Sequence, residues 1–435
     1  MIDGMTPTPA GPIWREYLRS MGPGLVTGSS DDDPSGIATY SQTGAQYGTS
    51  LLWVALLTFP LMAAVQEICD RTALATGLGI GEMAVRRFNR TGKWVVGTLL
   101  VALIAANLLN IAADLEAIGS GMNLLHAGPV WLWALAAGGV ITGLLIIGSY
   151  QRIALVFKFL SLTLLVYVVV MVLVTRDWAR LLESAVIPHI QLSRSFIALL
   201  VAILGTTISP YLFFWQSANR LEEMRDEPEG GDEPTPLRKK GPVRAAFKQR
   251  TSRFDVFSGM AFSNFVMFAI IATTAETLHV HHTLHIQSAA EAAQALKPLA
   301  GRFASEIFAL GFIGSGLLAI PVLAASGSVG MTGLLGKDWG FSRSVRKAPL
   351  FYVLVILGTL GGTALSLLSI NPIKLLVLVA VIDGVLAAPL LVVVMIVSRS
   401  RRLMGKYVNG KAANILGWIT VALMAGASIA MFVIG

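Results

Sequence analysis

The sequence has little charge and almost no cysteine. Only 13% of its 435 residues are Asp, Glu, Lys or Arg, whereas 54% are hydrophobic and the mean hydropathy is +0.69. A soluble domain carries about 25% charged residues, so this composition excludes one and predicts an all-α integral membrane protein. The single cysteine, Cys69, excludes an intrachain disulfide. No paired nucleophile and base and no phosphate-binding loop stands out, so we expect neither an enzyme nor a cofactor.

Long apolar runs predict eleven membrane spans. Each is close to the ~20 residues that cross a bilayer, and several contain Gly or Pro. The runs are Pro23–Tyr47, Leu51–Cys69, Trp94–Asn123, Pro129–Ser149, Ile153–Val174, Phe196–Ala218, Val256–Ala275, Phe303–Leu334, Pro349–Ser369, Ile373–Ser398 and Ala413–Ile434.

The basic residues predict an orientation. With the N-terminus inside, roughly four-fifths of the Lys and Arg residues fall in cytoplasmic segments, as the positive-inside rule requires. We therefore interpret the net charge of +8 as a topology signal and expect no nucleic-acid partner. The N-terminus shows no cleavable signal pattern. We expect a multi-pass protein of the bacterial inner membrane, in contact with the lipid bilayer, with a cytoplasmic N-terminus and a periplasmic C-terminus.

Two polar loops interrupt the spans. Glu222–Arg253 is acidic, then basic, and rich in Pro and Gly, which predicts a mobile cytoplasmic connector. Glu276–Lys297 carries an amphipathic helix pattern and four histidines that either bind a transition metal or remain solvated without converging. These histidines are His279, His281, His282 and His285.

The first span contains the sequence DDDPSG at its middle. Acids inside a membrane are costly and are functional by default. Asp33 is a preferred helix N-cap and Pro34 a preferred first helical residue, so a second half-helix is predicted to start inside the span. Successive side chains on a helix point about 100° apart, so Asp31, Asp32 and Asp33 cannot all face one ion unless the helix is unwound there.

The sixth span repeats this pattern in GTTISPYL, where Ser209 is the predicted N-cap and Pro210 opens a second half-helix. Unpaired backbone groups at such breaks are tolerated only where they line a cavity or bind something. Interrupted helices in spans one and six predict an inverted-repeat secondary transporter with its site between the breaks. Asp33, backbone carbonyls and the Ser209 hydroxyl are hard oxygen ligands, which favours a hard cation.

At these residues the sequence resembles the NRAMP divalent-metal transporter family over nearly its whole length. The shared motifs are GPG at Gly22, DPSG at Asp33, TGAQYG at Thr43, LATG at Leu74, LEAIG at Leu115, GTTISP at Gly205, ASGSVGMTG at Ala325 and MGKYVNG at Met404. The resemblance implies the LeuT-type 5+5 inverted repeat plus an eleventh transmembrane helix, and transport of Mn²⁺ or Fe²⁺, usually with protons. It implies a cytoplasmic segment (1–20), two five-helix repeats (21–174 and 175–399, with a cytoplasmic linker at 221–252) and the eleventh helix (400–435).

The resemblance also implies a metal site at Asp33, Gly36, Thr206 and Ser209. Asp33 matches the metal-binding Asp of the family, but Gly36 replaces its Asn. Ser209 replaces the Met whose sulfur helps to select transition ions, Tyr211 replaces a His, and Thr206 supplies the expected carbonyl. These changes predict a roomier and harder site, better suited to a partly hydrated ion such as Mg²⁺.

Other membrane acids are candidates for an additional site or for proton coupling. In the third span, Glu116 is in register with a family acid, but Ala113 replaces the other and Asp114 lies one position away. Asp383 in the tenth span is a candidate gate or second-shell ligand. Loss of the family histidine weakens the case for proton coupling, whereas Asp31, Asp32 or Glu116 keeps a proton route open.

The leading hypothesis is thus a secondary transporter of a divalent cation, Mg²⁺ and/or Mn²⁺. An alternative keeps the fold but changes the cargo to a small amine or amino acid, with its carboxylate held at the half-helix amide ends. A third is a sensor or assembly subunit that no longer transports, because fold does not fix function.

Overall fold

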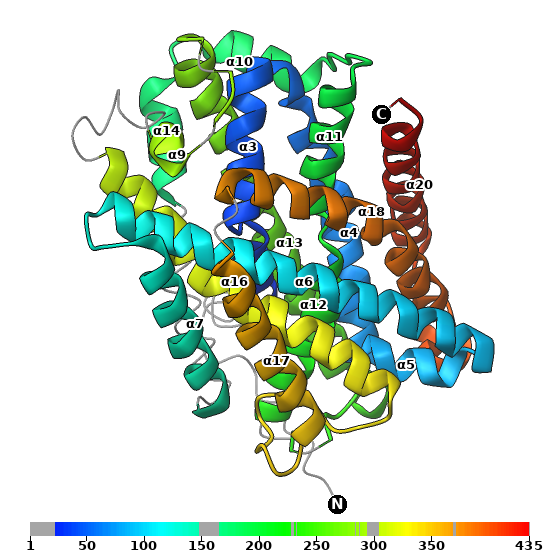
Figure 1. Cartoon of the computed structure of the whole chain (residues 1–435). Helices are drawn as coiled ribbons and strands as arrows, with labels where there is room; N and C mark the ends of the chain where they lie inside the picture. The colour runs from blue at the N-terminus through cyan, green and yellow to red at the C-terminus, as the bar shows by residue number, and fades with distance from the viewer. Residues whose placement is uncertain are drawn as a thin grey trace, which may run out of the picture.

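The computed structural model describes residues 22–147, 165–227, 230–231, 233–282, 284–286, 288–293, 304–368 and 371–434. All regular elements in these ranges are helices (Figure 1). Within them, nine helical segments are long and apolar enough to cross a membrane. They comprise α4 (Trp53–Thr76), α6 (Arg90–Leu124), α7 (Val130–Ile147), α11 (Arg194–Thr207) with α12 (Pro210–Asp226), α13 (Pro242–Thr274) with the π-helical turn η4 (Ala275–His279), α16 (Ala304–Leu334), α17 (Pro349–Ser366), α18 (Pro372–Ser398) and α20 (Lys411–Ile434).

Two further predicted spans differ from these. The first is divided into α2 (Pro23–Asp31) and α3 (Pro34–Tyr47), as its sequence predicts. Of the fifth, Ile153–Val174, only α9 (Leu165–Val174) is described, and its earlier part lies outside the described residues. Shorter elements connect the spans: η1 (Gly48–Leu51), α5 (Ile80–Arg87), α10 (Trp178–Val186), η3 (Leu237–Lys239), α14 (Ala289–Ala293), α19 (Arg401–Met404) and η7 (Gly405–Tyr407).

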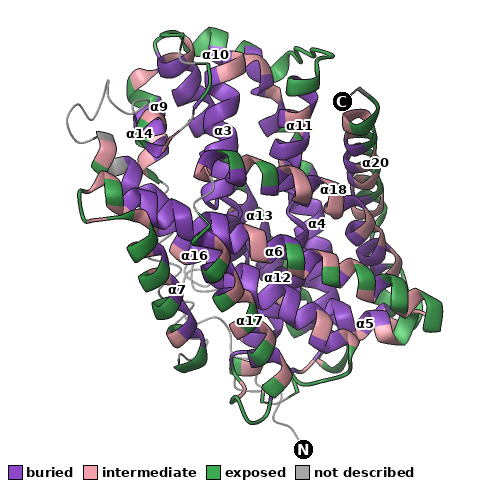
Figure 2. Ribbon diagram, viewed as in Figure 1, coloured by how far each residue is buried: buried purple, intermediate pink, exposed green. Residues whose placement is uncertain are grey.

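The broken helices lie inside the bundle and the unbroken outer helices surround them. Figure 2 shows α3, α12 and α13 largely buried, whereas α7, α17 and α20 carry exposed faces. In the most apolar stretch of α20, only 22% of the residues are buried within the protein, against 89% in that of α11 with α12. Outer helices with exposed Leu, Ile, Val and Trp side chains suit a lipid surface, because their backbone groups are satisfied within the helix.

Glycines bring the broken helices unusually close to their neighbours. A Cβ atom at Gly28 of α2 would collide with the backbone of Gly259 in α13, and one at Gly205 of α11 would collide with Ala380 and Gly384 in α18. Small residues at such crossings let two backbones approach closely in a membrane. The half-helices α2 and α11 are therefore held by backbone contact as well as by side chains.

The prediction of a mobile connector at Glu222–Arg253 was wrong at both of its ends. Helix α12 continues to Asp226, and α13 already begins at Pro242. Ion pairs explain the difference, since Glu222 pairs with Arg225 within α12, and Lys248 of α13 pairs with both Glu223 and Glu227. The acidic and basic halves that suggest disorder in sequence neutralise each other across the two helices.

Candidate metal-transport site

The first break is formed by Asp32 and Asp33 between α2 and α3. Asp33 is the N-cap of α3, as predicted, and its Oδ1 accepts hydrogen bonds from the Gly36 amide at 2.7 Å and from Ser35 Oγ at 2.6 Å. Pro34 follows as the first helical residue. The carboxylate is 1% exposed, so a charged group is held inside the protein by local donors.

The second break lies between α11 and α12, at Ile208 and Ser209. Ser209 occupies the predicted N-cap position, but its hydroxyl makes no capping hydrogen bond. It donates backwards instead, to the carbonyl oxygens of Thr206 at 2.7 Å and Gly205 at 3.1 Å. Two of the predicted metal ligands, the Ser209 hydroxyl and the Thr206 carbonyl, are therefore bonded to each other.

The two breaks face each other. The Tyr211 hydroxyl, at the start of α12, lies 3.3 Å from Asp33 Oδ2 and 3.2 Å from the Ser30 carbonyl oxygen of α2. Ser35 Oγ lies 3.5 Å from Thr206 Oγ1. The structure thus brings together all four predicted ligands and Tyr211.

The space left by Gly36 is filled, contrary to the prediction of a roomier site. A Cβ atom at Gly36 would lie 3.1 Å from Thr206 Oγ1 and 3.4 Å from the Asp31 carbonyl oxygen. Thr206 of α11 and Tyr40 of α3 thus leave little room for a side chain at this position. The predicted ligand atoms are all oxygens, and a hard-cation site at this position stays a prediction.

The other acids of the first break point elsewhere. Asp31 Oδ2 accepts a hydrogen bond from Ser263 Oγ of α13 at 2.9 Å. Both carboxylate oxygens of Asp32 are buried without a hydrogen-bond partner. Asp31 and Asp33 therefore contact different helices, and Asp33 is the one that Tyr211 of α12 contacts.

The acids of α6 and α18 occupy a separate position. Asp114 and Glu116 are both buried on α6, and Asp383 is buried on α18. Asp383 Oδ2 accepts a hydrogen bond from Asn110 Nδ2 at 2.7 Å. The sequence reasoning missed Asn110, Ser35 and Ser263, although each is a polar residue inside an apolar span, and Asn110 precedes Asp114 by one turn.

The four histidines do not form a metal site. His279 Nδ1 lies 2.9 Å from the Ala45 carbonyl oxygen, and His281 Nδ1 lies 2.6 Å from that of Thr277. Within the described ranges, no group of three or more His, Cys, Asp or Glu side chains is arranged to hold a metal ion. The solvated alternative is the one that the geometry supports.

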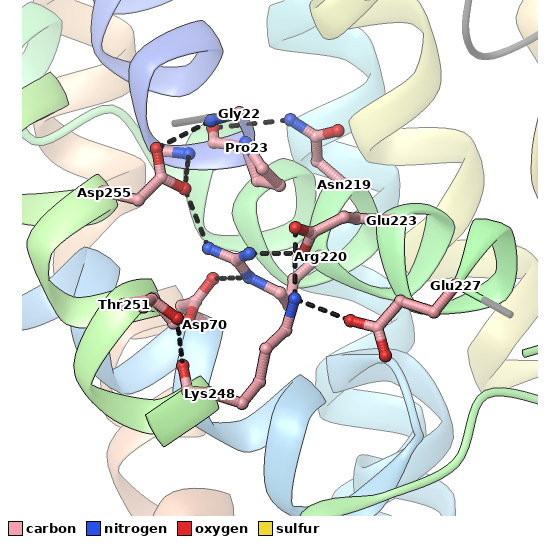
Figure 3. Close-up of polar contacts among 12 residues, drawn as sticks. Gly22, Pro23, Asp70, Asn219, Arg220, Glu223, Glu227, Lys248, Thr251 and Asp255 are labelled. Carbon is pink, nitrogen blue, oxygen red and sulfur yellow. Dashed lines mark hydrogen bonds and ion pairs between the residues drawn. The ribbon is translucent and has the colours of Figure 1, made fainter. Parts of the chain in front are cut away.

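A buried ion cluster holds the beginning of α2 (Figure 3). Asp255 of α13 accepts hydrogen bonds from the amides of Gly22 at 2.9 Å, Gly24 at 2.9 Å and Leu25 at 3.3 Å. Its Oδ2 also pairs with Arg220 Nη2 at 2.9 Å. The N-terminus of α2 has no capping side chain of its own, so a carboxylate from α13 takes that role.

Arg220 of α12 joins this cap to the rest of the bundle. Its guanidinium pairs with Asp70 of α4 at 2.6 Å and with Glu223 one turn away. Asp70 and Glu223 each have a partner besides Arg220. Gln216 donates to Asp70 at 2.8 Å, and Lys248 pairs with Glu223 at 3.1 Å. The first half-helix is thereby tied to α4, α12 and α13 at once.

Two interrupted helices that face each other inside an all-helical bundle define a membrane protein of the LeuT-type 5+5 inverted-repeat fold, followed by an eleventh helix. The fold is similar to that of an Eremococcus coleocola manganese transporter, with a TM-score of 0.72, 17% identity, and coverage of 97% of this chain and 88% of that one. It is also similar to Mhp1, a nucleobase-cation-symport-1 family transporter, with a TM-score of 0.58, 15% identity, and coverage of 95% and 90%.

A family model described as "Natural resistance-associated macrophage protein-like" matches residues 24–434, and the chain belongs to this Nramp family. A curated relative from Aeromonas hydrophila, named divalent metal cation transporter MntH, is 27% identical over 428 residues, which cover 96% of each chain. Another of the same name, from Deinococcus radiodurans, is 27% identical over 419 residues, covering 94% of this chain and 88% of that one.

Proposed function

We propose that this protein moves a divalent cation, Mg²⁺ and/or Mn²⁺, across the bacterial inner membrane through the junction of the two broken helices. The observation that carries the proposal is the buried Asp33 carboxylate, which caps α3 and faces the start of α12. Membership of the Nramp family and relatives named as divalent metal cation transporters support a metal cargo over the alternative of an amine or amino acid.

The ligand set favours a hard ion. Asp33 supplies the charge, while the Thr206 carbonyl and the Ser209 hydroxyl supply neutral oxygens. A cation that enters the junction displaces the Tyr211 hydroxyl from Asp33 and competes for the bond between Ser209 and Thr206. Because no thioether is present at this position, the site lacks the soft ligand that favours transition ions over Mg²⁺.

We further propose that transport does not require a proton gradient. Tyr211 stands where the family pattern has a histidine, and a phenol does not titrate near neutral pH as imidazole does. We also propose a cytoplasmic N-terminus and a periplasmic C-terminus, which the distribution of Lys and Arg supports. Uptake measured with and without an inward proton gradient tests whether transport requires protons, and equal initial rates of uptake are expected.

The central experiment is ion uptake by proteoliposomes with an entrapped indicator. Wild-type protein, Asp33→Ala and empty vesicles are compared for Mg²⁺ and Mn²⁺. The matched control is Thr142→Val, which removes a buried hydroxyl that pairs with Thr359 between α7 and α17, outside the site.

Saturable uptake by wild type and Thr142→Val, lost in Asp33→Ala, is expected. Uptake that survives in Asp33→Ala would move the ion path away from the broken helices. Absence of uptake of both ions, in protein that elutes as a single folded species, would reject a divalent-cation cargo and return attention to organic solutes.

A further inference from the structure

Asn110 of α6 and Asp383 of α18 meet between the two helices, and Asp114 lies one turn along α6 from Asn110. Asn110 and Asp114 are one turn apart on α6, so they share a face of that helix. Asn110 Nδ2 donates to Asp383 Oδ2 of α18 at 2.7 Å. All three side chains are at most 1% exposed.

This cluster has an excess of oxygen atoms without donors. Four buried oxygens have no hydrogen-bond partner: Asp114 Oδ1 and Oδ2, Asp383 Oδ1, and Asn110 Oδ1. An unpaired polar atom in an apolar interior costs free energy, and an unpaired carboxylate costs much more. A cation bound among these side chains would supply the partner that such oxygens lack, and two carboxylates would balance two positive charges.

The cluster is close to the broken helices but is built from different elements. Gly384, which follows Asp383 in α18, packs against Gly205 of α11. Asp383 therefore lies next in sequence to a residue that contacts the last turn before the second break. Both α6 and α18 pack against α3. Asp114 and Asp383 each interact electrostatically with Asp33.

We propose that Asn110, Asp114 and Asp383 bind a second divalent cation of the hard class, Mg²⁺ or Mn²⁺. The ligands are carboxylate and amide oxygens, which suit these ions and not soft metals. The site goes beyond the proposed function, because none of its ligands comes from the broken helices. An ion held here repels an ion at Asp33 and so promotes its release, as in conduction pathways with several sites.

The test is the Mn²⁺ stoichiometry of the tag-free full-length protein in lipid nanodiscs, measured by equilibrium dialysis and calorimetry. Wild type is compared with Asp383→Asn, Asp114→Asn and Asp33→Asn, and Thr142→Val is again the control. We expect two ions per chain in wild type and control. Each Asp→Asn variant should bind one ion at least tenfold more weakly and the other with the same or a higher affinity, because the repulsion between the two ions is relieved.

The outcomes separate the two sites. One ion in wild type that is lost only in Asp33→Asn, or two ions that persist in Asp383→Asn and Asp114→Asn, overturns the second site and leaves the proposed transport site intact. One ion lost in Asp383→Asn but kept in Asp33→Asn supports the second site and rejects the first. No bound ion in folded wild-type protein overturns both.

A gain of affinity provides a test that does not depend on losing a ligand. Asn110→Asp adds a third carboxylate beside Asp114 and Asp383 without changing the size of the side chain. The second ion should then bind at least tenfold more tightly, while the affinity at Asp33 stays the same or falls through repulsion. Unchanged affinity for both ions in Asn110→Asp contradicts the proposal.

Discussion

The link between Asp255 and the start of α2 makes a quantitative prediction. Asp255 accepts three backbone N–H groups of the first half-helix and pairs with Arg220, whose side chain is 1% exposed. Asp255→Asn retains an oxygen acceptor but removes the charge. Removing one partner of a buried ion pair costs about 3 to 5 kcal/mol. We take the lower value, since the amide still accepts a hydrogen bond.

A cost of about 3 kcal/mol changes the ratio of docked to released α2 about 100-fold. The assay uses Val26, which is buried on α2, as a cysteine reporter in a Cys69→Ala background. The rate of maleimide labelling of the Val26→Cys protein follows the released fraction when the docked state dominates. We expect the Asp255→Asn substitution to raise this rate about 100-fold, in line with that ratio.

Glu223→Gln is the matched control. Glu223 also pairs with Arg220, but its side chain is 25% exposed and it does not contact α2 through any bond described above. Because Glu223 is partly exposed and water can solvate it, we expect its loss to cost about 1 kcal/mol, so the labelling rate should rise only about fivefold. Equal labelling rates in Asp255→Asn and Glu223→Gln would refute the view that Asp255 holds the half-helix in place.

Three other predictions follow from the site and the connector. Ser209→Met adds a thioether and should shift the uptake ratio from Mg²⁺ toward Mn²⁺. An unchanged ratio would mean that residue 209 does not determine ion selectivity. Gly36→Asn should lower the free energy of unfolding by about 1 to 3 kcal/mol through overpacking against Thr206, and adding Thr206→Ala should restore part of it, as thermal unfolding will measure. Burial by itself raises the pKa of Glu227, but the ion pair with Lys248, together with the charge and hydrogen bond of Lys240, outweighs burial and holds the pKa below 4.5. The stabilisation from this pair should be complete above pH 4.5 and be lost as pH falls through the lowered pKa, so the difference in Tm between wild type and Glu227→Gln should vanish in acid.

The elements that could be predicted are those that local sequence controls. A span of apolar residues must form a helix in lipid, because no water satisfies its backbone, and this predicts most of the bundle. The breaks were also predictable, since Asp33 before Pro34 and Ser209 before Pro210 are signals that act within a few residues. The unwound positions therefore follow directly from the sequence.

Predictions from local sequence were wrong where a contact with a distant residue determines the local structure. The connector carries the composition of a disordered segment, yet Lys248 of α13 pairs with Glu223 on the facing helix α12. The hydroxyl of Ser209 was predicted to cap α12, but it bonds to the preceding turn because carbonyls there are closer. The space expected at Gly36 is closed by Thr206, a residue 170 positions further along the chain.

The sequence by itself determined the membrane spans, the two breaks and the oxygen chemistry of the site, because each depends on residues adjacent in the chain. Only the tertiary structure decided which acids act together. Asp33 meets Tyr211, Asp255 meets the start of α2, and Asp383 meets Asn110, over separations of 178, 233 and 273 residues. Such pairs form through helix packing, since the close contacts of Gly28 with Gly259 and of Gly205 with Gly384 fix which helix faces adjoin.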